Sequence, residues 1–251
     1  MSLIGQGLSI GFPKIQSCKN QIDRFRTKFG MTNFKKLCAF TLSELLLSLT
    51  IVGVIAVLTV PVIVSNVQKR MFATKLRNFV AEIEQLAQQE LIRHRTRDLF
   101  NTDFADPEKL LSDKHFKIVK SCDGSTAPRD CWKTRALGKD KIFYKNINKS
   151  SAGDTSNYKY YTIILKNGII LEYRLYNNYG MFFIDVNGSD KPNIAGRDYF
   201  AFLINKKGRT VDWGKINRHD YDQSLAACKN SSYGYYYCYS VLAKNNWKMD
   251  Y

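Results

Sequence analysis

One apolar stretch constrains this chain more than any other feature. Residues 40–68 read FTLSELLLSLTIVGVIAVLTVPVIVSNVQ, and their only ionisable side chain is Glu44. A helix over residues 40–64, with about 25 residues at 1.5 Å each, is about 38 Å long and exceeds the roughly 30 Å of a bilayer's hydrocarbon core. The stretch therefore predicts a helix that can span a membrane.

Glu44 distinguishes between the interpretations of this stretch. A secretory signal peptide has a shorter apolar region, of about 7 to 15 residues, and rarely contains an acid. An ordinary single-pass anchor explains the length and the preceding Lys35 and Lys36, because basic residues favour the cytoplasmic side. It leaves Glu44 unexplained, since a carboxylate in hydrocarbon costs about 3 kcal/mol and the stretch contains no basic partner. A free amino terminus created at Phe40 on a neighbouring copy would be such a partner.

The residues around Phe40 carry a resemblance to a known family. Residues 35–39 (KKLCA) followed by residues 40–46 (FTLSELL) resemble the class III signal of type IV prepilins and type II secretion pseudopilins. In that family a basic leader precedes a small residue and a Phe, with Glu fifth in the mature chain. Ala39 stands where Gly is commoner. Gly53 and Pro61 stand where many members have a helix-loosening Gly and Pro, and we expect both within the helix.

The resemblance implies a processing and assembly pathway. A prepilin peptidase would cut between Ala39 and Phe40 and methylate the new amino group, with which Glu44 would pair. The helix would hold the subunit in the inner membrane, with its N-terminus cytoplasmic and its head exported. Assembly machinery with a cytoplasmic ATPase would then add it to a periplasmic or extracellular filament of identical or related pilin subunits. Pilus and pseudopilus, and major and minor subunit, both stay open.

We divide the chain into three parts: a leader (1–39), a transmembrane or filament-core helix (40–65) and a globular head (66–251). Met31 is followed by the basic octapeptide TNFKKLCA. We therefore expect translation to begin at Met31 and residues 1–30 to be an upstream extension.

The head is expected to be α+β. Apolar residues recur at helical spacing after Asn66, so we expect one nearly continuous helix over residues 41–97 whose second half covers a sheet. The apolar stripe comprises Val67, Met71, Leu76, Phe79 or Val80, Ile83, Leu86 and Leu91. Residues 98–157 are expected to form a variable connection.

Segments rich in β-branched and aromatic residues predict an antiparallel sheet of about four strands. The expected strands are 158–166, 169–176, 181–186 and 199–205. Asn167-Gly168 predicts a hairpin, and Lys207-Gly208 predicts another that leads to residues 210–213. A long helix followed by such a sheet resembles the pilin head.

The cysteines divide unevenly along the chain. Two precede the apolar stretch and four lie in the head: Cys18, Cys38, Cys122, Cys131, Cys228 and Cys238. The late cysteines have neither CxxC nor zinc-site spacing, which favours disulfides in an oxidising compartment, with three pairings open. A bridge from Cys122 to Cys131 would remove about 3 kcal/mol of unfolded-chain entropy. The resemblance implies a disulfide-closed C-terminal region around Cys228 and Cys238, whose tyrosines would contact other subunits.

One turn predicts a calcium site. Residues 185–190 (DVNGSD) offer hard oxygen ligands around a glycine, and the candidate ligands are Asp185, Asn187 and Asp190. The turn lacks the closing Glu of an EF-hand loop, and such turns also form for conformational reasons alone. Some major pseudopilins bind calcium in this half of the head, so the resemblance adds to the hypothesis.

Charge and motifs limit the remaining functions. The 38 Lys and Arg against 22 Asp and Glu give a net charge of +16, which favours anionic partners such as DNA. A solvated basic face is the simpler interpretation of the residues that mix basic and aromatic character: Lys206, Lys207, Arg209, Lys244, Trp247 and Lys248. The chain contains no GxSxG, HExxH or Walker-type motif, and its three histidines are scattered, so we expect no enzyme. The alternative is a membrane-anchored minor pilin that binds DNA or a surface ligand.

Overall fold

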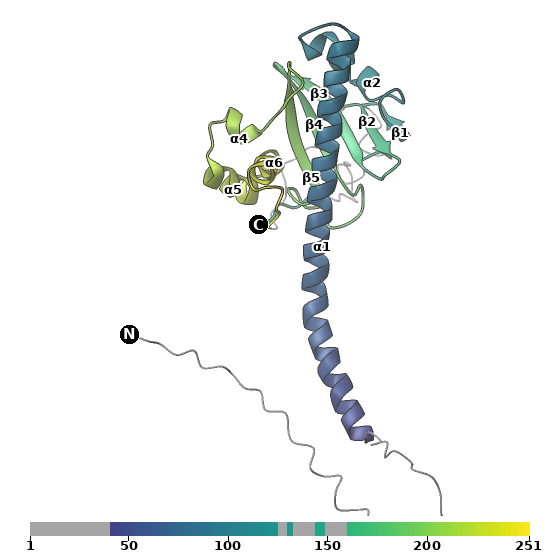
Figure 1. Cartoon of the computed structure of the whole chain (residues 1–251), viewed down its shortest axis with the longest axis vertical. Helices are drawn as coiled ribbons and strands as arrows, with labels where there is room; N and C mark the ends of the chain where they lie inside the picture. The colour runs from purple at the N-terminus through teal and green to yellow at the C-terminus, as the bar shows by residue number, and fades with distance from the viewer. Residues whose placement is uncertain (1–40, 125–129, 133–143, 149–159) are drawn as a thin grey trace, which may run out of the picture. The chain divides into compact units, whose positions relative to one another are not determined.

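The structure, a computed structural model, describes residues 41–124, 130–132, 144–148 and 160–251 (Figure 1). The leader with Cys18 and Cys38, the expected start at Met31, and the cleavage site between Ala39 and Phe40 lie outside the described residues. The chain divides into two compact units, Met1–Gly53 and Val54–Tyr251.

The longest element is the helix α1, Leu42–Arg93, which contains both Gly53 and Pro61. Every residue of α1 up to Val64 is exposed. The helix ends because Arg95 adopts a left-handed conformation with φ of +50°, and the N–H of Thr96 donates to the Leu91 carbonyl at 3.1 Å. These features form a Schellman motif, which closes a helix. The predicted end at residue 97 was therefore wrong.

Three short helices follow α1: η1 (Leu99–Asn101), η2 (Asp103–Ala105) and α2 (Pro107–Leu110). Each begins at a side-chain cap, provided by Asp98, Thr102 and Asp106 in turn. The strand β1, Ile118–Cys122, comes next. These four elements lie in the region expected to be a variable connection, and they were not predicted because each is too short to show a period and depends on caps or strand pairing.

The sheet has six strands in the order β1-β2-β3-β4-β5-β6, all antiparallel to their neighbours. After β1 the strands are β2 (Thr162–Leu165), β3 (Ile170–Tyr176), β4 (Tyr179–Asp185), β5 (Tyr199–Asn205) and β6 (Thr210–Val211). Both predicted hairpins are confirmed, with Gly168 at φ +83° and Gly208 at φ +70°. The predicted count of about four strands was too low. The last strand is shorter than predicted because Asp212 caps the helix α4, Trp213–Ile216.

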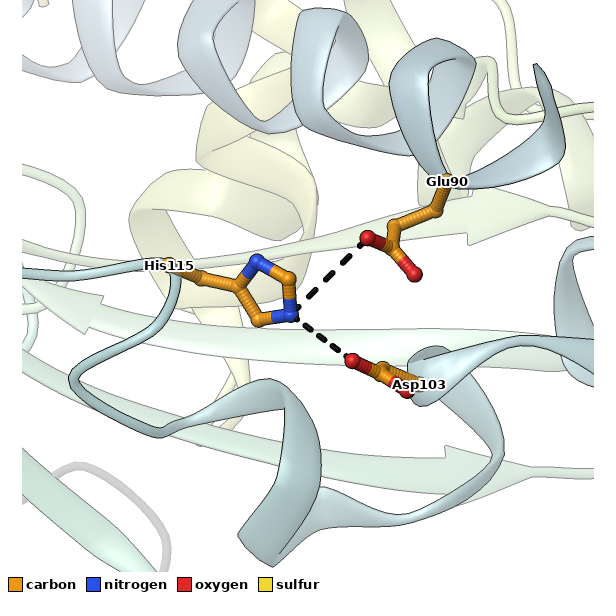
Figure 2. Close-up of side chains that lie close together, drawn as sticks. All are labelled: Glu90, Asp103 and His115. Atoms are coloured by element: carbon orange, nitrogen blue, oxygen red, sulfur yellow. Dashed lines mark hydrogen bonds and ion pairs between the residues drawn. The ribbon is translucent and has the colours of Figure 1, made fainter. Parts of the chain in front are cut away.

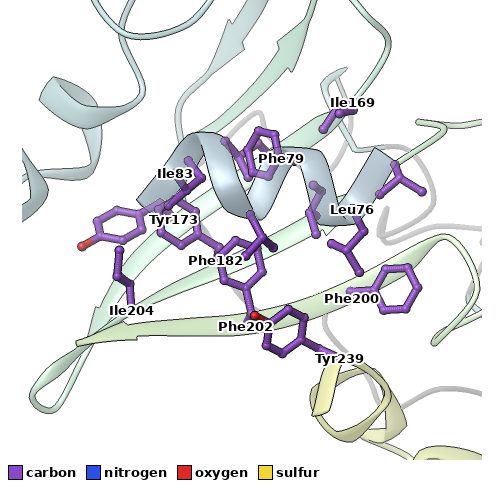
Figure 3. Close-up of a cluster of buried hydrophobic side chains, with 14 of the residues drawn as sticks. Leu76, Phe79, Ile83, Ile169, Tyr173, Phe182, Phe200, Phe202, Ile204 and Tyr239 are labelled. Carbon is purple, nitrogen blue, oxygen red and sulfur yellow. The ribbon is translucent and has the colours of Figure 1, made fainter. Parts of the chain in front are cut away.

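The second half of α1 covers one face of this sheet (Figure 3). Its buried side chains include Leu76, Phe79, Val80 and Ile83, as the apolar stripe predicted. They meet the strand residues Tyr173, Phe182, Ile184, Phe200, Phe202 and Ile204. Val67 and Met71 were expected in the stripe but are 50% and 49% exposed, because the buried face of α1 begins only at Phe72.

The C-terminal region forms two further helices, α5 (Tyr221–Asn230) and α6 (Gly234–Lys244), and α6 lies beside β5. The expected role of the tail tyrosines in surface contact is wrong for Tyr235 and Tyr239. Tyr235 packs in the core on the opposite sheet face with Tyr199 and Phe183, whereas Tyr239 joins the core beneath α1. Tyr233 is 48% exposed.

Candidate functional sites

Glu44 caps the N-terminal end of its own helix. Its Oε2 accepts hydrogen bonds from the backbone N–H of Thr41 at 2.9 Å and from the Thr41 hydroxyl at 2.8 Å. The Glu44 N–H in turn reaches the Thr41 Oγ1 at 3.3 Å. This is the reciprocal pattern of a capping box, which satisfies backbone donors that an α-helix leaves free. The carboxylate therefore faces the residue that directly follows Phe40.

The first part of the helix that carries Glu44, up to Val64, is apolar over its whole circumference apart from Glu44 itself. Among the described residues, α1 is the one helix long and apolar enough to cross a membrane. The helix continues through Gly53 and Pro61, and both residues are exposed. A Cβ at Gly53 would meet nothing within 4 Å. A helix that is hydrophobic all round belongs in a membrane or inside a larger protein body. The loosening role of Gly53 and Pro61 stays a prediction.

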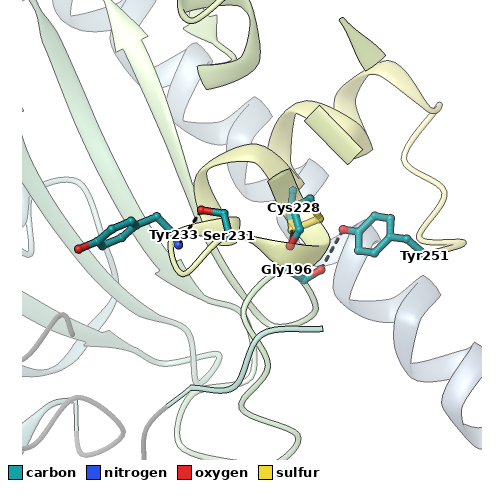
Figure 4. The surroundings of a disulfide bond; sticks show 6 residues. Gly196, Cys228, Ser231, Tyr233 and Tyr251 are labelled. Atoms are coloured by element: carbon teal, nitrogen blue, oxygen red, sulfur yellow. Dashed lines mark hydrogen bonds between the residues drawn. A yellow bond between two sulfur atoms is a disulfide. The ribbon is translucent and has the colours of Figure 1, made fainter. Parts of the chain in front are cut away.

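The four cysteines of the head form two local disulfides, Cys122–Cys131 and Cys228–Cys238. The pairing is one of the three that the sequence left open. The second bridge joins α5 to α6 and packs against Gly196, whose carbonyl accepts a hydrogen bond from the Tyr251 hydroxyl at 2.8 Å (Figure 4). Gly196 has φ of +86°, and a Cβ there would lie 2.3 Å from the Cys238 Sγ. The bridge therefore ties the C-terminal helices to the loop before β5.

The predicted calcium ligands have different surroundings. Asp185 is fully buried, and its carboxylate accepts hydrogen bonds from the Asn187 N–H at 3.1 Å and from the Tyr144 hydroxyl. The Asn187 amide donates to the Asp190 carbonyl at 2.9 Å and to the Lys191 carbonyl at 3.1 Å. Asp190 is exposed. These bonds hold the turn together from within, and calcium binding there stays a prediction.

A second buried acid lies close to Asp185. The Asp198 carboxylate accepts hydrogen bonds from the backbone N–H groups of Asn193 at 2.6 Å and Ile194 at 2.7 Å. Burial raises the pKa of Asp198 to about 6, against the lowering effect of these bonds. Burial, with the charge of Asp198 as the next cause, raises the pKa of Asp185 well above its usual value. Two adjacent buried carboxyls favour a protonated form because ionising both is unfavourable.

Outside the predicted sites, the fold assembles a cluster of Glu90, Asp103 and His115 (Figure 2). Each offers one metal-ligand atom, and these atoms lie within 4.8 Å of one another. Glu90 comes from the last turns of α1, Asp103 from η2, and His115 from the segment before β1. His115 Nε2 is 3.0 Å from Asp103 Oδ2 and 4.0 Å from Glu90 Oε1.

Cations surround this cluster. Arg93 hydrogen-bonds to Glu90 Oε1, and Lys114 hydrogen-bonds to Asp103 Oδ2. The bond from Lys114 lowers the pKa of Asp103, and the bond from His115 adds to the effect. His94 Nε2 lies 3.2 Å from Glu90 Oε2. The three histidines are scattered in the sequence, yet the fold brings His94 and His115 to the same acids. Glu90 and His94 are one helical turn apart, whereas only the tertiary fold brings in Asp103 and His115.

The basic residues considered for DNA binding lie in separate places. Lys206 and Lys207 occupy the β5–β6 turn and line a cavity with Asp98 and Tyr179. Trp247 and Lys248 line a different cavity, with Lys69 and Arg70. Lys244 donates to the His219 carbonyl at 3.4 Å. The contact of these residues with DNA stays a prediction.

Comparison with known proteins gave no match among protein-family models, curated proteins or solved structures.

Proposed function

We propose that this chain is a structural subunit of a type IV pilus or a type II secretion pseudopilus, and not an enzyme. A prepilin peptidase removes the leader after Ala39 and methylates Phe40. Before assembly the subunit is anchored in the inner membrane, with its N-terminus cytoplasmic and its head exported. The assembly machinery then adds it to the filament through its N-terminal helix.

One observation carries the proposal: the first part of α1 is exposed and apolar on every side, and its single acid lies in the first turn. Exposed apolar surface on this scale needs a cover, because soluble monomers rarely expose contiguous apolar patches larger than a few hundred Å². A membrane covers such a helix before assembly, and neighbouring copies cover it afterwards. The charge of Glu44 is compatible with the membrane and with the filament only if an amine pairs with it, because an unpaired buried carboxylate is energetically unfavourable in each.

The packing of the second half of α1 in the head also supports the proposal. It packs on the six-stranded antiparallel sheet of the head, and two disulfides stabilise the head. Disulfides persist in oxidising compartments. An exported head on a membrane helix is the arrangement that a filament subunit needs.

Electron microscopy of sheared surface material tests the proposal. Cells with the gene should yield filaments, cells without it should lack them, and complementation should restore them. For a subunit of a periplasmic pseudopilus, the matching readout is crosslinking of the chain into a ladder of multimers in intact cells. The absence of both gene-dependent filaments and a crosslinked ladder of multimers would contradict the proposal and favour the membrane-anchored binding module.

A further inference from the structure

We propose that Glu90, Asp103 and His115 bind a zinc-type divalent metal ion. Two carboxylate oxygens and one imidazole nitrogen form a donor set that zinc and other first-row divalent ions accept. Calcium takes oxygen ligands, so the histidine disfavours it. The inference rests on the head alone and not on the proposed filament function.

The burial of Glu90 gives an independent reason for a ligand at this place. Its side chain is fully buried, and within the described part of the chain its Oε2 accepts no hydrogen bond. A buried polar atom without a hydrogen-bond partner destabilises the fold. His94 Nε2 lies 3.2 Å from that oxygen, but not in hydrogen-bond geometry. Two ligands of one tetrahedral zinc, each about 2.0–2.1 Å from the metal, lie about 3.4 Å apart without sharing a proton.

The spacing of the three ligands is close to what a metal requires. Their ligand atoms lie within 4.8 Å of one another, with His115 and Asp103 already at 3.0 Å. A common separation of about 3.4 Å therefore needs side-chain movements of about 1 Å, which bring the wider pairs together and move His115 and Asp103 slightly apart. His94, 3.9 Å from Asp103 Oδ1, is the nearest further imidazole for a fourth position.

Arg93 and Lys114 compete with a metal for the same carboxylates. Their side chains are 47% and 49% exposed, whereas those of Glu90, His115 and Asp103 are 0%, 2% and 15% exposed. The two cations can therefore turn into solvent while the buried ligands stay in place. Without a metal, the cluster is an ion-pair network, so the experiment must distinguish the two.

A bound metal would join three segments that are distant in sequence. It would link the C-terminal end of α1 to η2 and to the segment before β1. Because binding favours the folded state, zinc would raise the melting temperature of the head.

Zinc binding to the full chain in detergent provides the test. The protein carries no histidine tag, and Cys18→Ser and Cys38→Ser remove the leader thiols. We expect the EDTA-treated chain to take up about one zinc per chain and to melt at a higher temperature with zinc than with EDTA or calcium. Asp103→Asn and His115→Gln should each weaken zinc binding by more than about 100-fold, since losing even an outer-shell partner costs about 10- to 100-fold.

Two further variants separate the metal site from the ion-pair network. Lys114→Gln should tighten zinc binding because it removes a cation that competes for the Asp103 carboxylate. The same change removes an ion pair of the network. His219→Gln, at a histidine outside the cluster, should bind zinc like the parent chain. The proposal is overturned if the parent takes up no zinc, if Lys114→Gln weakens binding, or if His219→Gln loses binding as His115→Gln does. Each variant's EDTA-treated melting temperature shows that it is folded.

Discussion

The carboxylate of Glu44 turns back onto Thr41, whose backbone N–H it accepts at 2.9 Å. In the uncut chain this contact caps the helix. Because Thr41 directly follows Phe40, a cut before Phe40 would place a new amine one residue from the cap. The proposed charge pair therefore begins from a carboxylate that already faces the N-terminal end of α1, and its amine can come from the same chain or from a neighbouring one.

Substitution of Glu44 separates its charge from its capping role. Glu44→Gln keeps the capping geometry, which Gln supports as Glu does, but it removes the charge. We expect Glu44→Gln and Glu44→Ala both to be cut after Ala39 and both to fail in assembly, as measured by the filament content of sheared fractions. Glu82→Ala, at an exposed acid of the same helix, should assemble normally. Normal filaments from Glu44→Gln would remove the charge-pairing argument.

The buried acids Asp185 and Asp198 predict an unusual pH dependence. A carboxyl whose pKa is raised on folding binds its proton more tightly in the folded state, so stability falls as pH rises. For Asp198 this contribution is complete below its usual pKa of 3.8 and is lost as pH rises through about 6. The shift corresponds to about 3 kcal/mol at 1.36 kcal/mol per unit. The raised pKa of Asp185 extends the loss to higher pH.

Asp185→Asn tests this dependence. The amide is neutral at every pH, can accept from the Asn187 N–H, and can donate to the Tyr144 hydroxyl. Urea unfolding should show the variant gaining stability over wild type between pH 5 and pH 8, by about 0.5–3 kcal/mol. Asp190→Asn, at an exposed position of the same turn, controls for a general charge effect. A difference that shrinks as pH rises would contradict the prediction.

Gly196 and Gly168 form a matched pair of left-handed glycines. A Cβ at Gly168 would meet nothing within 4 Å, whereas one at Gly196 would strike the Cys238 Sγ at 2.3 Å. Gly168→Ala should therefore cost only the backbone strain, about 1 kcal/mol, and Gly196→Ala should cost clearly more. Melting temperatures of both variants, with the disulfide intact, measure the difference. Equal losses would show that the loop does not pack on the bridge as described.

Glu84 fastens α1 to the last hairpin of the sheet. Its Oε1 accepts both the backbone N–H and the hydroxyl of Thr210, each at 2.7 Å. Glu84→Ala should destabilise the head by about 1–3 kcal/mol because it leaves these partly buried donors without their acceptor. Glu82→Ala is the surface control, with an expected effect within about 0.5 kcal/mol. Chemical denaturation of both variants provides the measurement.

The sequence predicted the features that local patterns determine. The long helix, its face at Leu76 and Ile83, and the turn at Gly168 each follow from periodicity or from a conformation that glycine adopts readily. The strand β1 could not be predicted, because three of its five residues are exposed and it is held in the sheet by pairing with β2. The meeting of Glu90 with Asp103 and His115 likewise needs three separate segments to be placed by the fold, so sequence spacing gives no signal for it.

Mass spectrometry of the mature N-terminal peptide tests the central claim most directly. The account predicts a peptide that begins at Phe40 with a methylated amino group, and no mature peptide that contains residues 35–39. Recovery of the mature chain with Ala39 still joined to Phe40 would contradict the account, because Glu44 would then have no new amine as its partner.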